Sequence, residues 1–304
     1  MSRIEKYQGV IPAFYACYDE EGNISPERVQ KLAKYYRDAG VQGLYVGGSS
    51  GECIYQSVDE RKLVLDNVME AVGEDLVIIV HVAAMSTRDS VELAKHAESV
   101  GADALSAIPT VYFGLSEAAI GAYWTAMIDA TDLDFIIYNI PQTTNYSLSL
   151  DLFKKMVAND KVIGVKNSSM PVLDIYQFIA NAGKDFVVLN GPDEQFISGL
   201  VMGAQAGIGG TYGVMPELFL AAFDAVKNNE MDLAQEIQYA INEIILLMVS
   251  GEGHMYAVIK EILAMNGLEV GTVRNPLPEL TENDQALVER SNDLINQAKA
   301  KFVK

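Results

Sequence analysis

Eight short apolar runs constrain the fold of this chain more than any other feature of its sequence. Each run is rich in valine, isoleucine, alanine or glycine, and a longer amphipathic segment separates it from the next. The runs are residues 9–14, 43–47, 76–82, 102–108, 135–139, 162–166, 186–190 and 206–210. They are apolar throughout rather than alternating, which is typical of parallel strands that are covered on both faces.

The segments between the runs carry signals for the start of helices. Ser25 is followed by Pro26, a pair typical of an N-cap and the first helical residue. Ser57 opens the Ser-Val-Asp-Glu pattern of a capping box, in which a hydroxyl and a carboxylate satisfy free backbone N–H groups. Further helix caps are expected at Ser86 and Asp193.

Eight strand–helix units indicate an α/β protein built as a (β/α)8 TIM barrel. A doubly wound open sheet is the alternative, because alternation alone does not establish that the sheet closes. Residues 1–228 are expected to form the barrel catalytic domain, and residues 229–304 lack strand-like runs. We expect this remainder to be a C-terminal extension of three helices, at roughly 231–250, 254–266 and 281–301.

Charge and hydropathy exclude several classes of protein. The 41 acidic residues exceed the 22 basic residues and give a net charge of −19, which repels nucleic acid and anionic membranes. No stretch approaches the roughly 18 uninterrupted apolar residues that a membrane-spanning helix requires. The first residues reach charge and Pro12 before any long apolar run, so no signal peptide is expected.

The cysteine and histidine content bears on compartment and on metal binding. Cys17 and Cys53 are too few for a disulfide framework, so we expect two reduced thiols in a cytoplasmic protein. His81, His96 and His254 are scattered and do not have the spacing of a metal site. The sequence therefore supports no metal.

Two residues at the ends of neighbouring runs are candidates for chemistry, because active groups of such barrels project from the C-terminal ends of the strands. Lys166 closes an apolar run, where burial lowers the pKa of an amine and allows it to attack a carbonyl carbon. The alternative is a lysine whose amine reaches water. Tyr138 closes the preceding run and is a candidate proton shuttle, or else an ordinary tyrosine of the core or rim.

A glycine-rich turn follows the second run, with the sequence Gly-Gly-Ser-Ser-Gly-Glu over residues 47–52. Its exposed N–H groups and the hydroxyls of Ser49 and Ser50 would suit a carboxylate ligand. A plain connecting turn is the alternative. We expect Glu52 to hold the loop in place rather than to touch a substrate.

Two more glycine-containing turns follow the seventh and eighth runs. Gly191, Asp193 and Glu194 come after the seventh, and paired carboxylates there suit a ligand with several hydroxyl groups. The alternative is that the acidic residues simply favour the start of a helix. The turn at 207–213 could bind phosphate, although no basic residue stands nearby to support this.

The motifs together resemble a known family. They are GLYVGGSSGE at 43–52, YNIP at 138–141, GVK at 164–166 and the glycine-rich turn at 207–213. In order and spacing they resemble the pyruvate-dependent class I aldolases of the N-acetylneuraminate lyase and dihydrodipicolinate synthase family. The form of the first motif, the Gly-x-Asp-Glu at 191–194 and the lack of an arginine soon after Pro141 resemble the lyase branch.

The resemblance implies reversible cleavage of N-acetylneuraminate to N-acetylmannosamine and pyruvate in a homotetramer built as a dimer of dimers, with no metal and no organic cofactor. It implies that Lys166 forms the Schiff base and that Tyr138 carries the proton. The residues implied to bind substrate are Ser49 and Ser50 for the carboxylate, Ser168 in the place of the usual threonine, and Gly191, Asp193 and Glu194 for the sugar hydroxyls. Tyr112 matches a tyrosine that reaches into a neighbouring subunit's site and completes a hydroxyl relay with Ser49 and Tyr138.

Two positions depart from the lyase pattern and keep other functions open. Pro192 stands where these lyases commonly have tyrosine, and Gly210 stands where a serine usually touches the substrate. The alternatives are an aldolase acting on a 2-keto-3-deoxy sugar acid, an enzyme like dihydrodipicolinate synthase, and a non-catalytic protein that binds a keto acid.

Overall fold

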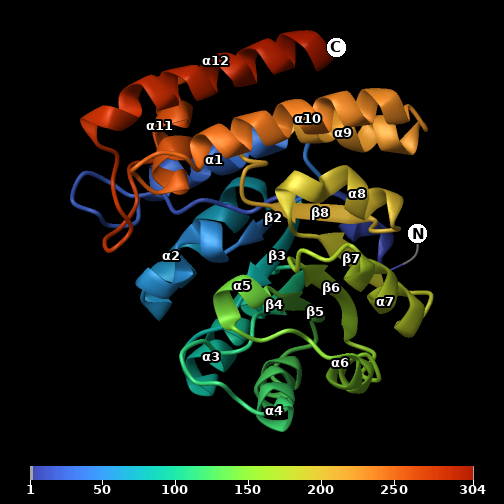
Figure 1. The fold of residues 1–304 in the computed structure, drawn as a ribbon. Helices are drawn as coiled ribbons and strands as arrows, with labels where there is room; N and C mark the ends of the chain where they lie inside the picture. Colours follow the sequence, from blue (N-terminus) through green and yellow to red (C-terminus); the bar gives the residue numbers. More distant parts are fainter. Residues whose placement is uncertain (1–2, 304) are drawn as a thin grey trace.

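The eight expected strands form one closed parallel barrel in the computed structural model, which describes residues 3–303. They are β1 (Gly9–Pro12), β2 (Gly43–Val46), β3 (Val77–His81), β4 (Ala104–Ala107), β5 (Asp134–Asn139), β6 (Val162–Asn167), β7 (Val187–Asn190) and β8 (Ala206–Gly209). Their order in the sheet is β1-β8-β7-β6-β5-β4-β3-β2. A bridge from Ala13 to Tyr45 joins the two end strands, with Phe14 N donating to Tyr45 O at 2.9 Å. The TIM barrel is therefore confirmed, and the open sheet is wrong (Figure 1).

Helices connect the strands and cover the outside of the barrel (Figure 1). They are α1 (Pro26–Asp38), α2 (Val58–Val72), α3 (Thr87–Ser99), α4 (Glu117–Ile128), α5 (Pro141–Thr144), α6 (Leu150–Met156), α7 (Leu173–Asn181), α8 (Phe196–Val201) and α9 (Pro216–Lys227). Short 3-10 helices are η1 (Glu5–Tyr7), η2 (Ser49–Gly51), η3 (Cys53–Tyr55) and η4 (Asp193–Gln195). Ser25, Ser57 and Ser86 cap α1, α2 and α3 as predicted, and Ser57 forms a full capping box with Glu60.

The expected helix cap at Asp193 is wrong. Asp193 lies in η4, and α8 begins at Phe196 without a side-chain cap. The Asp193 carboxylate is instead buried, and its Oδ2 accepts hydrogen bonds from Thr211 N at 2.7 Å and Thr211 Oγ1 at 2.6 Å. The two donors from the loop after β8 satisfy this carboxylate, so it does not turn back to cap the helix.

The apolar side chains divide into two shells. One fills the inside of the barrel and includes Ile11, Tyr45, Ile79, Ile136, Tyr138, Leu189 and Ile208. The other, much larger, lies between the strands and the surrounding helices. Strands buried on both faces explain why the runs are apolar throughout. Polar groups at the C-terminal strand ends therefore come together at one mouth of the barrel.

Three further helices follow the barrel: α10 (Met231–Met248), α11 (Met255–Met265) and α12 (Gln285–Phe302), the last preceded by η5 (Glu282–Asp284). Their positions match the expected helices to within a few residues. Figure 1 shows α10 and α12 lying beside α9, and these three helices contact one another. None of the helices in residues 3–303 is both long and apolar enough to cross a membrane.

Candidate active site

Lys166 lies between two aromatic rings at the mouth of the barrel. Strands β5 and β6 pair so that Tyr138 and Lys166 are direct partners in register. The Lys166 Nζ atom is 4.1 Å from the centre of the Tyr138 ring and 4.2 Å from the centre of the Tyr45 ring. Both Lys166 and Tyr138 are buried, and no residue of the described chain forms an ion pair with Lys166. The amine is therefore held in place while its lone pair stays available.

The electrostatics of the site favour a reactive amine beside a protonated phenol. Burial lowers the pKa of Lys166 to about 7, although the nearby Asp193 carboxylate acts in the opposite direction. Burial also raises the pKa of Tyr138, and polar contacts with Ser168 and Ser49 partly offset that rise. Near neutral pH a substantial fraction of Lys166 is thus an uncharged nucleophile. Tyr138 keeps its phenolic proton, so it could take part in proton transfer only by releasing that proton as it accepts another.

Asparagine side chains fix the strand ends that carry these groups. Asn139 Nδ2 donates to Asn167 Oδ1 at 2.8 Å, which links β5 to β6 directly beyond Tyr138 and Lys166. Asn190 Nδ2 donates to Pro192 O at 2.8 Å and holds the turn after β7. Buried amide contacts of this kind hold the backbone on either side of the reactive pair in a single arrangement.

The turn after β2 lies at the C-terminal end of its strand and carries hydrogen-bond donors. Ser49 and Ser50 begin η2, and their backbone N–H groups donate to no acceptor among residues 3–303. The Ser50 side chain is buried, and its Oγ donates to the hydroxyl of Tyr256, from α11, at 2.9 Å. Two unpaired N–H groups beside two hydroxyls can hold a carboxylate.

The turn after β7 brings Gly191 and Asp193 to the same mouth, while Glu194 is exposed. Burial raises the pKa of Asp193 to about 6, and the hydrogen bonds from Thr211 oppose this. Gly191 packs so closely that a Cβ there would collide with the Oγ of Ser168. The Asp193 carboxylate is therefore committed to the loop after β8 and raises the pKa of Lys166, whereas the Glu194 side chain is exposed.

Gly210 marks the side of the mouth that faces α11. Its carbonyl accepts from the Tyr15 hydroxyl at 2.6 Å. A Cβ added at Gly210 would lie 3.2 Å from both Ser50 Oγ and the Tyr256 hydroxyl. The space that a serine side chain would need is therefore bordered by the hydroxyl of Tyr256.

Tyr112 does not join the site within one chain. It lies in the loop before α4, is 87% exposed, and contacts Phe113 edge-on with ring centres 4.9 Å apart. Its φ of 84° is unusual for a residue other than glycine. The other candidate residues lie around a single mouth.

Sequence reasoning missed several residues that build this site. Tyr45 supplies an aromatic face to Lys166, and its position inside the second apolar run was the available signal. Thr211 holds Asp193, and Tyr256 reaches Ser50 from a distant helix, for which no local pattern exists. Among residues 3–303 no three His, Cys, Asp or Glu side chains are grouped to hold a metal ion, and both cysteines are free and buried.

Comparison with known proteins gives close relatives over the whole length. Residues 6–294 match the dihydrodipicolinate synthetase family. An N-acetylneuraminate lyase of Mediterraneibacter gnavus is 56% identical, with 100% of this chain and 97% of the relative aligned. N-acetylneuraminate lyase 2 of Escherichia coli is 34% identical over 92% of this chain and 91% of the relative. The solved structure of a catalytic lysine mutant of Ruminococcus gnavus sialic acid aldolase matches with a TM-score of 0.98 and 56% identity, covering 100% of both chains.

Proposed function

This chain belongs to the dihydrodipicolinate synthetase family, and we propose that it is a lyase that cleaves N-acetylneuraminate reversibly to N-acetylmannosamine and pyruvate. The observation that carries the proposal is the environment of Lys166. A buried amine with a pKa of about 7 is held between Tyr45 and Tyr138 and has no ion-pair partner in residues 3–303. That is the state in which a lysine attacks a carbonyl carbon.

The reaction follows from these positions. The Lys166 amine adds to the keto carbon of the open-chain sugar acid, the resulting hydroxyl takes up a proton from solvent and leaves as water, and a protonated imine remains. The substrate carboxylate is held by the backbone N–H groups of Ser49 and Ser50 and by the hydroxyl of Ser49, while the Ser50 hydroxyl donates to Tyr256. Tyr138 accepts the proton of the substrate's C4 hydroxyl and passes its own phenolic proton to the substrate carboxylate, either directly or through a serine hydroxyl that releases its own proton as it accepts one.

As that proton leaves, the bond between C3 and C4 breaks and its electrons move into the imine, which becomes an enamine. The aldehyde of N-acetylmannosamine departs. Protonation of the enamine carbon and hydrolysis of the imine then release pyruvate and restore the Lys166 amine. Water and the protons exchanged with it are the only co-reactants, and we expect Gly191, Glu194, Ser168 and Gly210 to border the sugar portion.

The test is reduction with borohydride in the presence of pyruvate, followed by intact mass and peptide mapping. We expect one adduct, on Lys166, that is lost in Lys166→Ala together with cleavage activity. Lys260 serves as an internal control, because it is equally buried but paired with Glu52. An adduct spread over surface lysines, or normal turnover in Lys166→Ala, would contradict the proposal.

A second substrate is kept open by Pro192 and Gly210, which place no phenol and no serine hydroxyl on the sugar side. An aldolase acting on a 2-keto-3-deoxy sugar acid would use the same Lys166 and Tyr138. Comparison of kcat/KM for that substrate and for N-acetylneuraminate decides between them. We expect N-acetylneuraminate to be preferred.

We further propose the assembly and compartment of the enzyme. Ile54, Met85, Tyr112 and Phe113 are exposed apolar residues, and Ile54 and Met85 line one pocket with Val111. A partner subunit covering this face would receive Tyr112 at its own site, within a homotetramer built as a dimer of dimers. Residues 1–228 would act as the catalytic domain, residues 229–304 as its extension, and free thiols suit the cytoplasm.

A further inference from the structure

We propose that helix α11 positions the turn after β2 (residues 47–52), here called the carboxylate turn. Lys260 would act on it through Glu52, and Tyr256 through Ser50. The inference rests on the proposed function, because it assumes that Ser49 and Ser50 hold the substrate carboxylate. It goes further by giving a helix outside the barrel a part in substrate binding. Lys260 is a positioning residue, since its amine is directed at Glu52 and not at the mouth.

The contact between Lys260 and Glu52 is a buried ion pair. Lys260 Nζ lies 2.6 Å from Glu52 Oε1, and the two side chains are 1% and 0% exposed. Lys260 Nζ also donates to Thr272 O at 2.7 Å, and Arg274 N donates to Glu52 Oε2 at 2.8 Å. Both oxygens of Glu52 are thus held by the C-terminal part of the chain.

Glu52 is the residue that ends the turn. It directly follows η2 and has φ 52° and ψ 34°, a left-handed conformation that few residues other than glycine adopt. Glu52 N donates to Ser49 O at 2.9 Å. Because the backbone of Glu52 is bonded to Ser49, a change in its side-chain contacts would move the N–H groups that we assign to the carboxylate.

Tyr256 makes a second contact from the same face of the helix. It precedes Lys260 by one helical turn, so the two side chains point in the same direction. Its hydroxyl accepts from Ser50 Oγ at 2.9 Å. Two successive turns of α11 therefore reach two residues of one short turn, Ser50 and Glu52.

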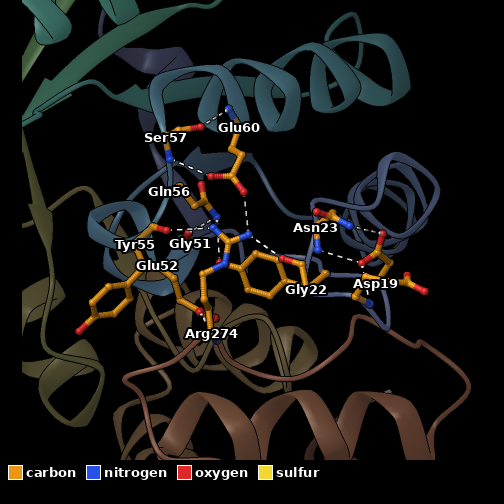
Figure 2. Close-up of polar contacts among 12 residues, drawn as sticks. Asp19, Gly22, Asn23, Gly51, Glu52, Tyr55, Gln56, Ser57, Glu60 and Arg274 are labelled. Atoms are coloured by element: carbon orange, nitrogen blue, oxygen red, sulfur yellow. Dashed lines mark hydrogen bonds and ion pairs between the residues drawn. The ribbon is translucent and has the colours of Figure 1, made fainter.

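Arg274 holds the segment that follows the turn. Figure 2 shows it among Glu52, Tyr55 and Glu60, with Nη1 donating to Tyr55 O at 2.9 Å and Nη2 lying 2.6 Å from Glu60 Oε1. Glu60 also closes the capping box with Ser57 at the start of α2. The backbone from the carboxylate turn to α2 is therefore held at both ends by the C-terminal part of the chain.

Stability alone is a poor explanation for the Lys260–Glu52 pair. Burial of two charges costs desolvation that largely offsets their attraction, so an apolar pair of similar size would serve a packing role equally well. An ion pair with further hydrogen bonds fixes direction as well as distance. The directed contact at Glu52 is thus better explained by the geometry that it imposes on the turn.

The experiment measures how borohydride trapping of pyruvate on Lys166 depends on pyruvate concentration in the full-length protein. Tyr256→Phe removes only the hydroxyl that contacts Ser50, and we expect the half-saturating concentration to rise about 3- to 10-fold. The double variant Glu52→Gln/Lys260→Met removes both buried charges together, and we expect a rise of at least about 10-fold. The yield at saturating pyruvate should remain close to that of the wild type.

The matched control is Lys299→Met, which breaks the Lys299–Glu217 pair of 2.9 Å that joins α12 to α9 away from the turn. We expect its half-saturating concentration to be unchanged. The thermal unfolding midpoint of every variant distinguishes a role in positioning the turn from a role in stability alone. A lower midpoint with unchanged half-saturation in Tyr256→Phe and in the double variant would assign α11 a purely structural role and overturn the inference.

The remaining outcomes are also decisive. If the wild type traps no pyruvate, the proposed function fails and the inference fails with it. If the wild type traps pyruvate and Tyr256→Phe has the wild-type half-saturating concentration, the proposed role of Tyr256 is overturned while the proposed function stands. If the double variant does not fold, Tyr256→Phe and the milder Lys260→Arg decide, and wild-type half-saturation in both would overturn the inference.

Discussion

In the proposed mechanism, Lys166 would set the pH range in which the enzyme can form its covalent intermediate. Its pKa is lowered by burial to about 7, and the deprotonated amine is the nucleophile. The initial rate of pyruvate trapping should therefore rise with pH through about 7 and level off above about 8. Rates measured in overlapping buffers between about pH 5 and 9 check this. A rise centred near the ordinary lysine pKa would contradict it.

Asp193 modulates that pH dependence from the neighbouring strand end. Its charge raises the pKa of Lys166 against the effect of burial. Asp193→Asn removes the charge, so the rising limb of the profile should move to lower pH. The same trapping assay measures the shift. A limb that moves to higher pH would mean that the two groups do not interact as the structure indicates.

Tyr138 is expected to act in bond cleavage and not in the attachment of pyruvate. Tyr138→Phe should lower kcat by roughly 10²–10⁴ because the proton relay is lost, while pyruvate is still trapped on Lys166. Tyr45→Phe is the matched control, since the Tyr45 hydroxyl bonds to Ser106 at 3.0 Å and its ring alone faces Lys166. Equal losses in both variants would argue for a packing effect.

At the scale of the elements, the helix caps are expected to contribute measurable stability. Ser57 accepts from Glu60 N at the start of α2, directly after the carboxylate turn. Ser57→Ala should lower the free energy of unfolding by about 1 kcal/mol, as measured with urea. Ser116→Ala, which removes the corresponding cap of α4, should have a similar effect. An unchanged free energy of unfolding in either variant would contradict the assignment of its helix cap.

The strands were predicted more accurately than the turns that follow them. An apolar run covered on both faces is a local signal, so all eight strands and the three C-terminal helices agree with the sequence to within a few residues. Asp193 shows the limit of such signals. A carboxylate at the start of a helix resembles a cap, but here Thr211 from the loop after β8 donates two hydrogen bonds to it instead.

At the scale of the whole molecule, we predict that the active site is shared between subunits. Tyr112 is exposed in one chain and would complete the site of its partner. Lys166→Ala subunits and Tyr112→Phe subunits should each have low activity alone. When the two are unfolded, mixed and refolded together, about a quarter of the sites should combine an intact Lys166 with a partner's intact Tyr112.

Activity of the mixture and sedimentation of the assembled species measure this result. The control is a mixture of Lys166→Ala with wild-type subunits, in which the number of active sites should simply follow the wild-type content. No gain of activity in mixtures that do assemble would show that Tyr112 does not serve a neighbouring site. A monomer with full activity would contradict the shared site directly.

The sequence by itself determined the eight strand–helix units and the pairing of the candidate reactive groups, whereas the closure of the sheet into a barrel was seen only in the structure. Apolar runs of strand length, separated by capped helices, allow few arrangements, and neighbouring parallel strands bring their ends to one mouth. Tyr138 and Lys166 close consecutive runs, so their proximity follows from chain order, and the structure places them in register. These features depend on local periodicity, which a single sequence displays.

Only the tertiary structure decided which residues surround and support that pair. Ser50 and Tyr256 are 206 positions apart, and Glu52 and Lys260 are 208 apart, so no local pattern links them. Their contacts exist because the C-terminal helices fold back beside the carboxylate turn. The low pKa of Lys166 has the same origin, since burial depends on everything that packs around the amine.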